Sequence, residues 1–450
     1  MEISIWDLVI DLGLISILLL IGVVLRAKIT VLQKLFLPAS VIAGLLGLLF
    51  GPNGLGIMPF SNLISDYPTV LIAVVFGSIP IGAARVNWKK TFGRVRNMWI
   101  YSMLLTAIMW GGGVFFTFVL LNQVWDLPSG FGLMLGAGFL GGHGTAAAVG
   151  EIFANNGWED GTMLGYTAAT VGILSSVIVG LLIIKRSAKK KQTSFISDFD
   201  ELPDELRTGL VKSGKRESSG EDTVSANTVD PLFFHFTILA AVVLASYWLQ
   251  GWIGQFFDNV SIPLLSVAFI VGLLFQIGLR ATHADEYVDK RVINRLSGSA
   301  TDLIVIFGIA SINLAIVADY AVPLIFLFIF GLFWAYGIFH FISPRVFHQN
   351  WFENGIFGWG WSTGTVAMGI ALLRIVDPKL RSTTLNDYAL GYIGMVPFEV
   401  LIITFGPILI VSGLDWLFFV ILFSVAAVLL AVAQKSGWLV SGEQVKERRG

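Results

Sequence analysis

The stretch LGGHGTAAAVGEIF, residues 140–153, places helix-breaking and polar residues in an otherwise strongly apolar part of the chain. Inside a membrane, such a backbone is stable only where it lines a cavity or is buried in protein, because its amide and carbonyl groups otherwise lack partners. Amide N–H groups at the start of a helix suit an anion, and carbonyls beside a hydroxyl suit a small hard cation. The residues that we expect to contact an anionic solute are Gly141, Gly142, His143, Gly144 and Thr145.

A second stretch, FGWGWSTGTVAMG at residues 357–369, offers similar chemistry. Two such stretches facing each other would form a compact site for an anionic solute and a cation such as sodium. Thr145 and Thr365 stand at matching places in HGTAA and TGTVA, and we expect both to bind the cation. The residues of this stretch that we expect to contact the solute are Gly360, Ser362, Thr363 and Gly364.

Three further side chains are candidate sodium ligands, namely Thr170, Asn313 and Glu399. A carboxyl group in the middle of an apolar run costs about 2.5 to 3.5 kcal/mol on membrane-insertion scales, so Glu399 is a functional candidate. A packed interior position, with a hydroxyl or water as partner, remains open for Glu399, and an interhelical hydrogen bond remains open for Asn313. His143 could contact the solute, carry a proton or brace the first stretch.

The composition indicates a polytopic membrane protein. The 450 residues are 55% hydrophobic and 13% charged, with a mean hydropathy of +0.79, which is more apolar surface than one soluble core would bury. The absence of Cys excludes disulfides and cysteine nucleophiles. Runs long enough to approach the roughly 20 residues of a bilayer crossing lie at 8–25, 35–50, 69–84, 98–121, 163–184, 232–254, 262–279, 301–319, 323–342, 388–412 and 415–433.

The basic residues decide how the two polar stretches are placed. If these eleven runs cross and segments 131–150 and 355–373 each enter and leave from the same side, all 29 Lys and Arg residues fall on one side. The positive-inside rule therefore predicts two re-entrant hairpins, an outside N-terminus and a cytoplasmic C-terminus. We expect the first run not to be a cleavable signal, because its leader MEISIWD is acidic and its basic residues follow the apolar stretch.

Weak internal matches predict two inverted repeats in an all-α fold. Pro38 and Pro263 each precede a GLLF sequence by nine residues, VLIAVVFGSIPI at 70–81 resembles DLIVIFGIASIN at 302–313, and HGTAA resembles TGTVA. Each half would hold five spans and one re-entrant segment, and an odd number of crossings inverts the second half. Such inverted repeats with broken segments near the midplane are typical of secondary transporters. The expected parts are 1–184, a solvated cytoplasmic linker at 185–231, 232–412, and an extra span with a tail at 413–450.

The chain resembles the glutamate:sodium symporter family through the GGHGT segment, the Gly-rich FGWG segment with its paired hydroxyls, and LPASVIAGLLG in the second span. The resemblance extends from about residue 10 to residue 412. It implies sodium-coupled uptake of glutamate, a homodimer, and an elevator-like or rocking movement of a domain that carries both re-entrant segments. The second segment departs from the family pattern, since Trp361 and Gly364 replace a small residue and a helix-breaking proline.

We therefore expect a symporter of glutamate or a related small carboxylate in the inner membrane of a bacterium, without an organic cofactor or a nucleic-acid partner. The alternatives are a carrier of 2-hydroxycarboxylates such as malate or citrate, for which Arg374 is the nearest basic residue, and a channel. An enzyme is not expected, because apart from His143 no midplane His, Lys or paired Asp offers a base beside a nucleophile. Asp11, Glu151, Asp302 and Asp319 are expected to lie near span ends or in loops and to be mostly solvated.

Overall fold

The structure is a computed structural model that describes residues 4–83, 88–190, 192–195, 204–216, 218–255, 263–378 and 380–449. Lys191 and residues 196–203, which begin the acidic part of the linker, lie outside this description. The described residues form helices, turns and loops, with no strand among them. The fold class is thus all-α and polytopic, as the sequence predicts.

Eleven helical segments of the described residues are long and apolar enough to cross a membrane. They are α1 (Ile5–Lys28), the segment Asn62–Gly82 that contains α4 (Tyr67–Gly82), α5 (Trp88–Val119), α8 (Gly161–Lys189), α10 (Pro231–Gly254), α11 (Leu264–Ala281), α12 (Lys290–Ala310), the segment Ala321–Val346 that contains α14 (Ala321–Gly337), α16 (Trp351–Val376), α17 (Thr384–Val411) and α18 (Asp415–Lys435). The number equals the predicted one, but the membership differs at one place, because α16 is counted and the predicted run at 35–50 is not.

Two predicted boundaries are wrong for local reasons. The run at 35–50 yields only α3 (Ala39–Phe50), because Pro38 fixes the helix start. The run at 301–319 is divided, since α12 ends at Ala310 and α13 (Leu314–Asp319) begins after an N-cap. Asn313 is that cap, and its Oδ1 atom accepts a hydrogen bond from the backbone N–H of Ala315 at 3.0 Å.

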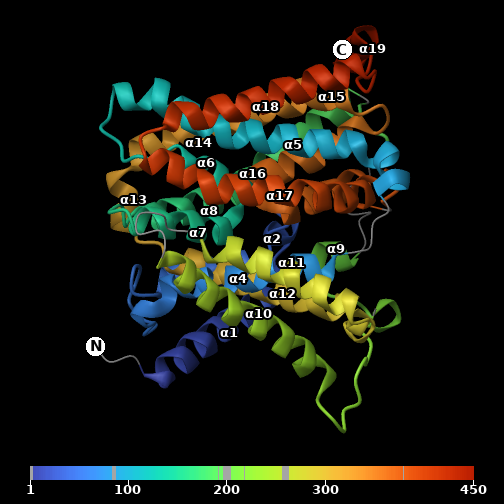
Figure 1. Ribbon diagram of the computed structural model, residues 1–450. Helices are drawn as coiled ribbons and strands as arrows, with labels where there is room; N and C mark the ends of the chain where they lie inside the picture. The colour runs from blue at the N-terminus through green and yellow to red at the C-terminus, as the bar shows by residue number, and fades with distance from the viewer. Residues whose placement is uncertain are drawn as a thin grey trace.

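The helices form two layers that lie one above the other in Figure 1. In the first layer, α4 packs against α11 and α12, and α3 packs against α1 and α12. We call this the crossed layer. In the second layer, α5 packs against α17 and α18, and α8 packs against α16. We call it the hairpin layer, for a reason given below.

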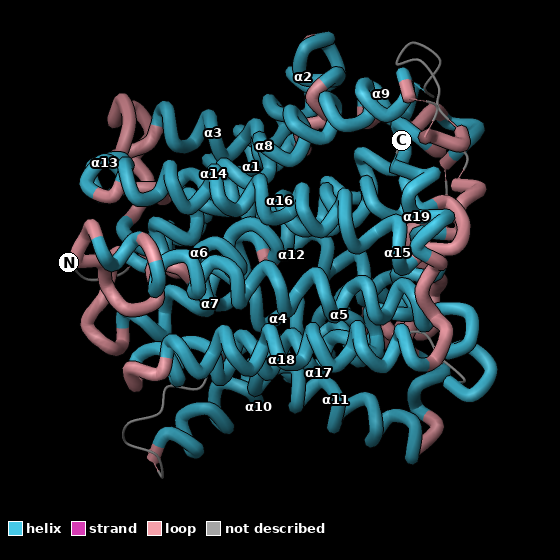
Figure 2. The backbone as a smooth tube through the Cα atoms, turned by 90° about the horizontal axis from the view of Figure 1, so that it is seen from above, coloured by secondary structure: helices cyan, strands magenta, loops and turns pink. Residues whose placement is uncertain are grey.

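Segments far apart in sequence meet at one end of the helix bundle. The Nζ atom of Lys290 donates to the carbonyl of Ala83 at 2.9 Å, and Arg94 forms an ion pair with Asp387 at 2.9 Å. These contacts join loops that the charge count places on one side, so we call this the basic end. The N-terminus lies at the opposite end from α15 (Ser343–Val346) and α19 (Gly442–Arg449) (Figure 2).

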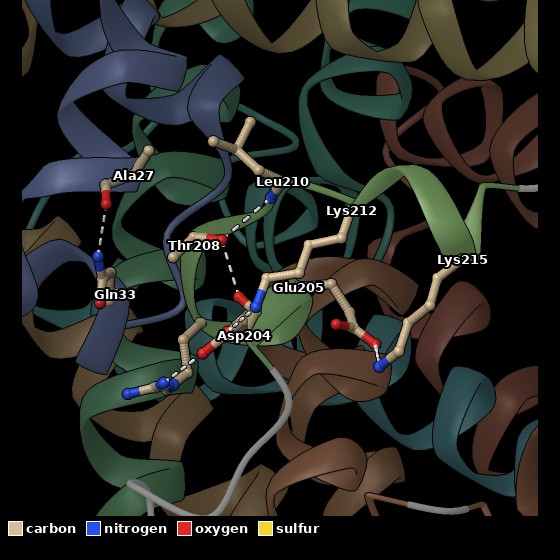
Figure 3. A network of polar contacts seen from close by, with 9 residues as sticks. Ala27, Gln33, Asp204, Glu205, Thr208, Leu210, Lys212 and Lys215 are labelled. Atoms are coloured by element: carbon tan, nitrogen blue, oxygen red, sulfur yellow. Dashed lines mark hydrogen bonds and ion pairs between the residues drawn. The ribbon is translucent and has the colours of Figure 1, made fainter.

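The described part of the linker contains a 3-10 turn at Ser213–Lys215 and a short α-helix, α9 (Asp204–Thr208), which lies against α1 and α2 (Thr30–Lys34). Figure 3 shows the ion pairs that hold it, with Lys212 2.6 Å from Asp204 and Lys215 2.9 Å from Glu205. Hydrogen bonds from Lys212 and Arg207 hold the pKa of Asp204 below its ordinary value. These groups are solvated, so salt screens their attraction.

Candidate functional site

The first polar stretch folds back on itself. Its entering arm comprises α6 (Leu133–Leu135) and a π-turn over Gly136–Leu140, and its returning arm is α7 (Gly142–Ala154). The two ends of the stretch meet, because Gly130 lies directly against the ring of Phe153. The reversal occurs at Gly142, which has a φ of +74°, in the left-handed region that favours glycine.

The second stretch reverses in the same manner inside α16. Gly364 and Thr365 have non-helical backbone angles, and Thr365 has a φ of +71°. The chain then returns along itself, since a Cβ atom on Gly360 would lie 2.6 Å from the Cα atom of Gly369. In a straight helix these two residues would be about 13.5 Å apart. Although α16 is long enough for a crossing, its contacts are those of a hairpin.

The two hairpins approach each other from opposite ends of α8. Near the start of α8, Gly150 of the first hairpin lies against Thr162. Beyond the other end of α8, the Ser194 N–H donates to Glu353, at the base of the second hairpin, at 2.7 Å.

The tips of the hairpins meet beside the middle of α8. A Cβ atom on Gly142 would lie 2.6 Å from the Cγ2 atom of Thr365, so the tips are in direct contact. The Nε1–H of Trp359 donates to the Ser176 carbonyl at 3.0 Å, which fixes the second hairpin on α8. The fold therefore brings together the two stretches that the sequence predicts to act together.

A cavity of about 290 Å³ lies where the tips face the crossed layer. Both hairpins, α3, α4, α8, α12 and α17 contribute to its wall. Of the residues predicted to bind solute or sodium, those in the wall are Gly141, Gly142, His143, Gly144, Thr145, Thr365 and Glu399. Among the described residues that line this cavity there is no Lys or Arg, and Arg374 is not one of them.

His143 is buried and held by α8. Its Nε2 atom lies 3.0 Å from the hydroxyl oxygen of Thr170, and that hydroxyl lies 2.8 Å from the carbonyl of Tyr166. Because the Thr170 hydroxyl donates its single proton to that carbonyl, it accepts from His143, which places the imidazole proton on Nε2. The Nδ1 atom has no partner among the described residues. The ring also packs on Gly308 of the crossed layer.

Glu399 is buried in α17 and contacts an aromatic cluster. The hydroxyl of Tyr392 donates to its Oε2 atom at 2.7 Å. The ring of Trp361 lies 6.2 Å from that of Tyr392 and 5.1 Å from that of Tyr388, edge-on in both cases. Trp361 thus packs against two tyrosines in the wall beside this carboxylate.

Several residues predicted to bind solute or sodium do not line the cavity. The hydroxyls of Ser362 and Thr363 donate to the carbonyl of Trp359 at 3.0 and 2.7 Å, so they are used within the hairpin arm. Gly360 packs on the opposite arm, and Gly364 packs on Ser176. Thr170, on α8, is in hydrogen-bond contact with His143, and Asn313 caps α13 and is not in the cavity lining.

Two acidic residues differ from the expectation of solvated positions. Asp302 lies midway along α12, lines the cavity and stands next to the Ser40 hydroxyl. Asp11 is fully buried and accepts hydrogen bonds from Ser61 and from the Tyr67 hydroxyl, the latter at 2.9 Å. Their positions inside predicted spans were the available signal, because a carboxylate within an apolar helix needs a partner or a cavity.

Comparison with models of protein families identifies the family of this chain. A family model described as sodium/glutamate symporter matches residues 5–357. The chain belongs to the sodium/glutamate symporter family. It is therefore a multi-pass membrane transporter of that family, as the GGHGT stretch indicates.

The family match ends within the entering arm of the second hairpin. The tip at Gly364 and Thr365 and the whole of α17 with Glu399 lie beyond the matched residues. None of the curated proteins matches this family member. Among solved structures, the sodium/proton antiporter MjNhaP1 from Methanocaldococcus jannaschii is similar at 19% identity and a TM-score of 0.39, over 99% of this chain and 100% of the antiporter.

Proposed function

We propose that the protein is a secondary active transporter that couples the uptake of glutamate to sodium by alternating access. The observation that carries this proposal is the contact between the two hairpin tips, with Gly142 against Thr365, at the wall of a cavity between two layers. Broken segments that meet inside a helix bundle present free backbone groups to a solute and an ion. Membership of the sodium/glutamate symporter family supports the same ion and substrate.

The chemistry of the cavity supports an amino acid over a 2-hydroxycarboxylate. Asp302 lines the cavity and can attract the ammonium group of an amino acid. The substrate carboxylates would then bind the N–H groups at the start of α7, where the helix dipole favours an anion. A malate or citrate carrier would need a basic residue in this wall, and Arg374 lies outside it.

Sodium would bind among oxygen ligands at the tips. Thr145 and Thr365 line the cavity from the two hairpins, and Glu399 supplies a carboxylate from α17. Oxygen ligands of this kind suit a small hard cation. In this proposal sodium is the coupling ion and no organic cofactor takes part.

Alternating access would arise from movement of the hairpin layer against the crossed layer. The tip of the first hairpin touches the crossed layer through Gly144 against Ile72 and through His143 against Gly308. The corresponding order of elements in residues 1–184 and 232–412 supports two inverted repeats with re-entrant hairpins. We further propose a homodimer in a bacterial inner membrane, with the basic end in the cytoplasm and the N-terminus outside.

The test is uptake of radiolabelled glutamate into proteoliposomes that contain the purified protein. We expect accumulation only with an inward sodium gradient, and competition by unlabelled glutamate or aspartate but not by malate or citrate. Accumulation of malate instead would establish the 2-hydroxycarboxylate carrier. Passive equilibration without dependence on the sodium gradient would establish a channel and contradict the proposal.

A further inference from the structure

A groove of about 440 Å³ lies between α8 and α14 on the hairpin layer, away from the cavity at the tips. Its walls follow one face of each helix. The residues that define the two walls are Val179, Leu182 and Arg186 on α8 and Ile329, Phe333 and Tyr336 on α14.

The groove changes from apolar to polar along its length. The two helices run in the same direction, because the Tyr320 hydroxyl before α14 donates to Asp160 before α8 at 3.4 Å and Arg186 and Tyr336, near the ends of the two helices, line the same groove. Val179 and Ile329 therefore lie nearer the middle of their helices, while Arg186 and Tyr336 lie nearer the basic end. This is the order of an acyl chain and a phosphate headgroup in one leaflet of a bilayer.

The apolar walls are open to the surroundings. Leu182 is 62% exposed and Phe333 is 74% exposed, although both belong to helices long enough to cross a membrane. The floor includes Trp359 from the entering arm of the second hairpin. A molecule in the groove would therefore touch the element that carries the second tip.

The polar end offers a guanidinium group for an anion. Arg186 is exposed in the last turn of α8, and none of the ion pairs among the described residues includes it. A guanidinium fork matches two oxygens of a phosphate group. On the facing side, a π-turn over Ile338–Ile342 follows α14, and such turns are frequent at binding sites.

We propose that this groove binds one anionic phospholipid, with its phosphate at Arg186 and one acyl chain along Val179, Leu182 and Phe333. The proposal does not depend on the substrate or the coupling ion. The positive groups lie at the end where the positive-inside rule places the cytoplasm, so the lipid belongs to the cytoplasmic leaflet.

Native mass spectrometry of the full-length protein, released from mixed phosphatidylglycerol and phosphatidylcholine nanodiscs, tests this site. We expect one retained phosphatidylglycerol per chain in the wild type and at least a tenfold loss of retention in Arg186→Gln. The matched control is Lys185→Gln, which removes the same charge one residue earlier on α8 but outside the groove lining. Glycerol phosphate, which lacks acyl chains, should not compete at millimolar concentration.

The apolar end needs its own pair of variants. Leu182→Trp should fill the groove and reduce lipid retention, whereas Ile178→Trp, on an exposed face of α8 outside the groove, should not. Equal retention in Arg186→Gln and Lys185→Gln, or equal retention of phosphatidylcholine, would overturn the proposal. Conversion of a dimer to a monomer by Leu182→Trp without loss of lipid would also overturn it, because the groove would then be a protein interface.

Discussion

Gly142 sets the shape of the first tip through its left-handed backbone and its contact with the second tip. A residue other than glycine in this region costs about 1 to 2 kcal/mol, and a Cβ atom here would also press on Thr365 at 2.6 Å. We expect Gly142→Ala to reduce sodium-driven glutamate uptake at least tenfold in proteoliposomes, at equal reconstituted amounts.

The matched control is Gly157→Ala. Gly157 has a φ of +91° in an exposed turn, and a Cβ atom there would have no neighbour within 4 Å. It therefore carries the same backbone strain without the contact between tips. Equal loss of uptake in both variants would show that strain, and not the meeting of the tips, matters.

Substitutions of the threonines at the tips can distinguish a role in sodium binding from a role in helix packing. Thr145 and Thr365 line the cavity, whereas the hydroxyl of Thr363 donates to a backbone carbonyl at 2.7 Å. Loss of one ligand should cost on the order of 1 to 2 kcal/mol, and each 1.4 kcal/mol is tenfold. We expect Thr145→Ala or Thr365→Ala to raise the sodium concentration for half-maximal uptake about tenfold, and Thr363→Ala to leave it unchanged within about threefold. An unchanged sodium dependence in both cavity variants would refute the assignment.

His143 braces the first tip through Thr170, and the bond needs only one N–H donor. We expect His143→Gln, which keeps a donor of similar reach, to retain at least about a third of the uptake with an unchanged pH profile between about 5.5 and 7.5. His143→Ala should lose most of it, since the Thr170 oxygen and the space beside Gly308 would be left without a partner. A profile that flattens in His143→Gln would instead identify the imidazole as a proton carrier.

The sequence located the tip residues because broken backbone in an apolar run has few uses other than lining a cavity. It could not supply side-chain direction. Ser362 and Thr363 carry suitable hydroxyls, yet both donate to the preceding turn, a bond that Ser and Thr make readily in any helix. The sequence predicts a run that starts at residue 301 and therefore a solvated Asp302 near its end, whereas α12 begins at Lys290 and places the carboxylate in mid-helix.

At the scale of elements, hydropathy found the helices but not all their ends. The run at 35–50 is apolar throughout, and only the proline at position 38 indicates that a short helix starts there. Reversal inside α16 is invisible to hydropathy, because a straight helix and a hairpin have the same composition. The charge count predicts a re-entrant segment at 355–373, and this membrane placement stays a prediction; the structure shows the reversal itself, with Gly360 against Gly369.

The linker helix α9 is held by solvated ion pairs, and we expect it to act as a tether. Because the pKa of Asp204 is lowered in the folded state, the pairing contributes stability above the ordinary value of 3.8 and loses it only as the pH falls through the lower value. Asp204→Asn should therefore increase hydrogen exchange in residues 204–216 at pH 7 without changing uptake by more than about twofold. A large change in uptake would indicate a regulatory linker.

At the scale of the whole molecule, each of the two layers has a polar contact between distant segments at the basic end. Segments from both halves of the chain meet at this end through Lys290 with Ala83 and Arg94 with Asp387. The hairpin bases then lie at opposite ends of α8, one at Thr162 and the other beyond Lys189. The tips therefore meet after approaching from opposite ends of α8, and under the proposed alternating access each hairpin would border the cavity from one side of the membrane.

The orientation in the membrane can be tested directly, because the chain contains no cysteine. Single cysteines at Ser194 and Ser225 lie on exposed linker residues at the basic end, and one at Asn156 lies in the exposed turn after α7. With a membrane-impermeant maleimide on intact cells, we expect labelling at Asn156 only; after permeabilisation, all three should react. The reason is that α8 separates these positions, and the positive-inside rule places the basic end in the cytoplasm. Labelling of Ser225 in intact cells would reverse the orientation, and labelling of both Asn156 and Ser194 from outside would contradict α8 as a crossing helix.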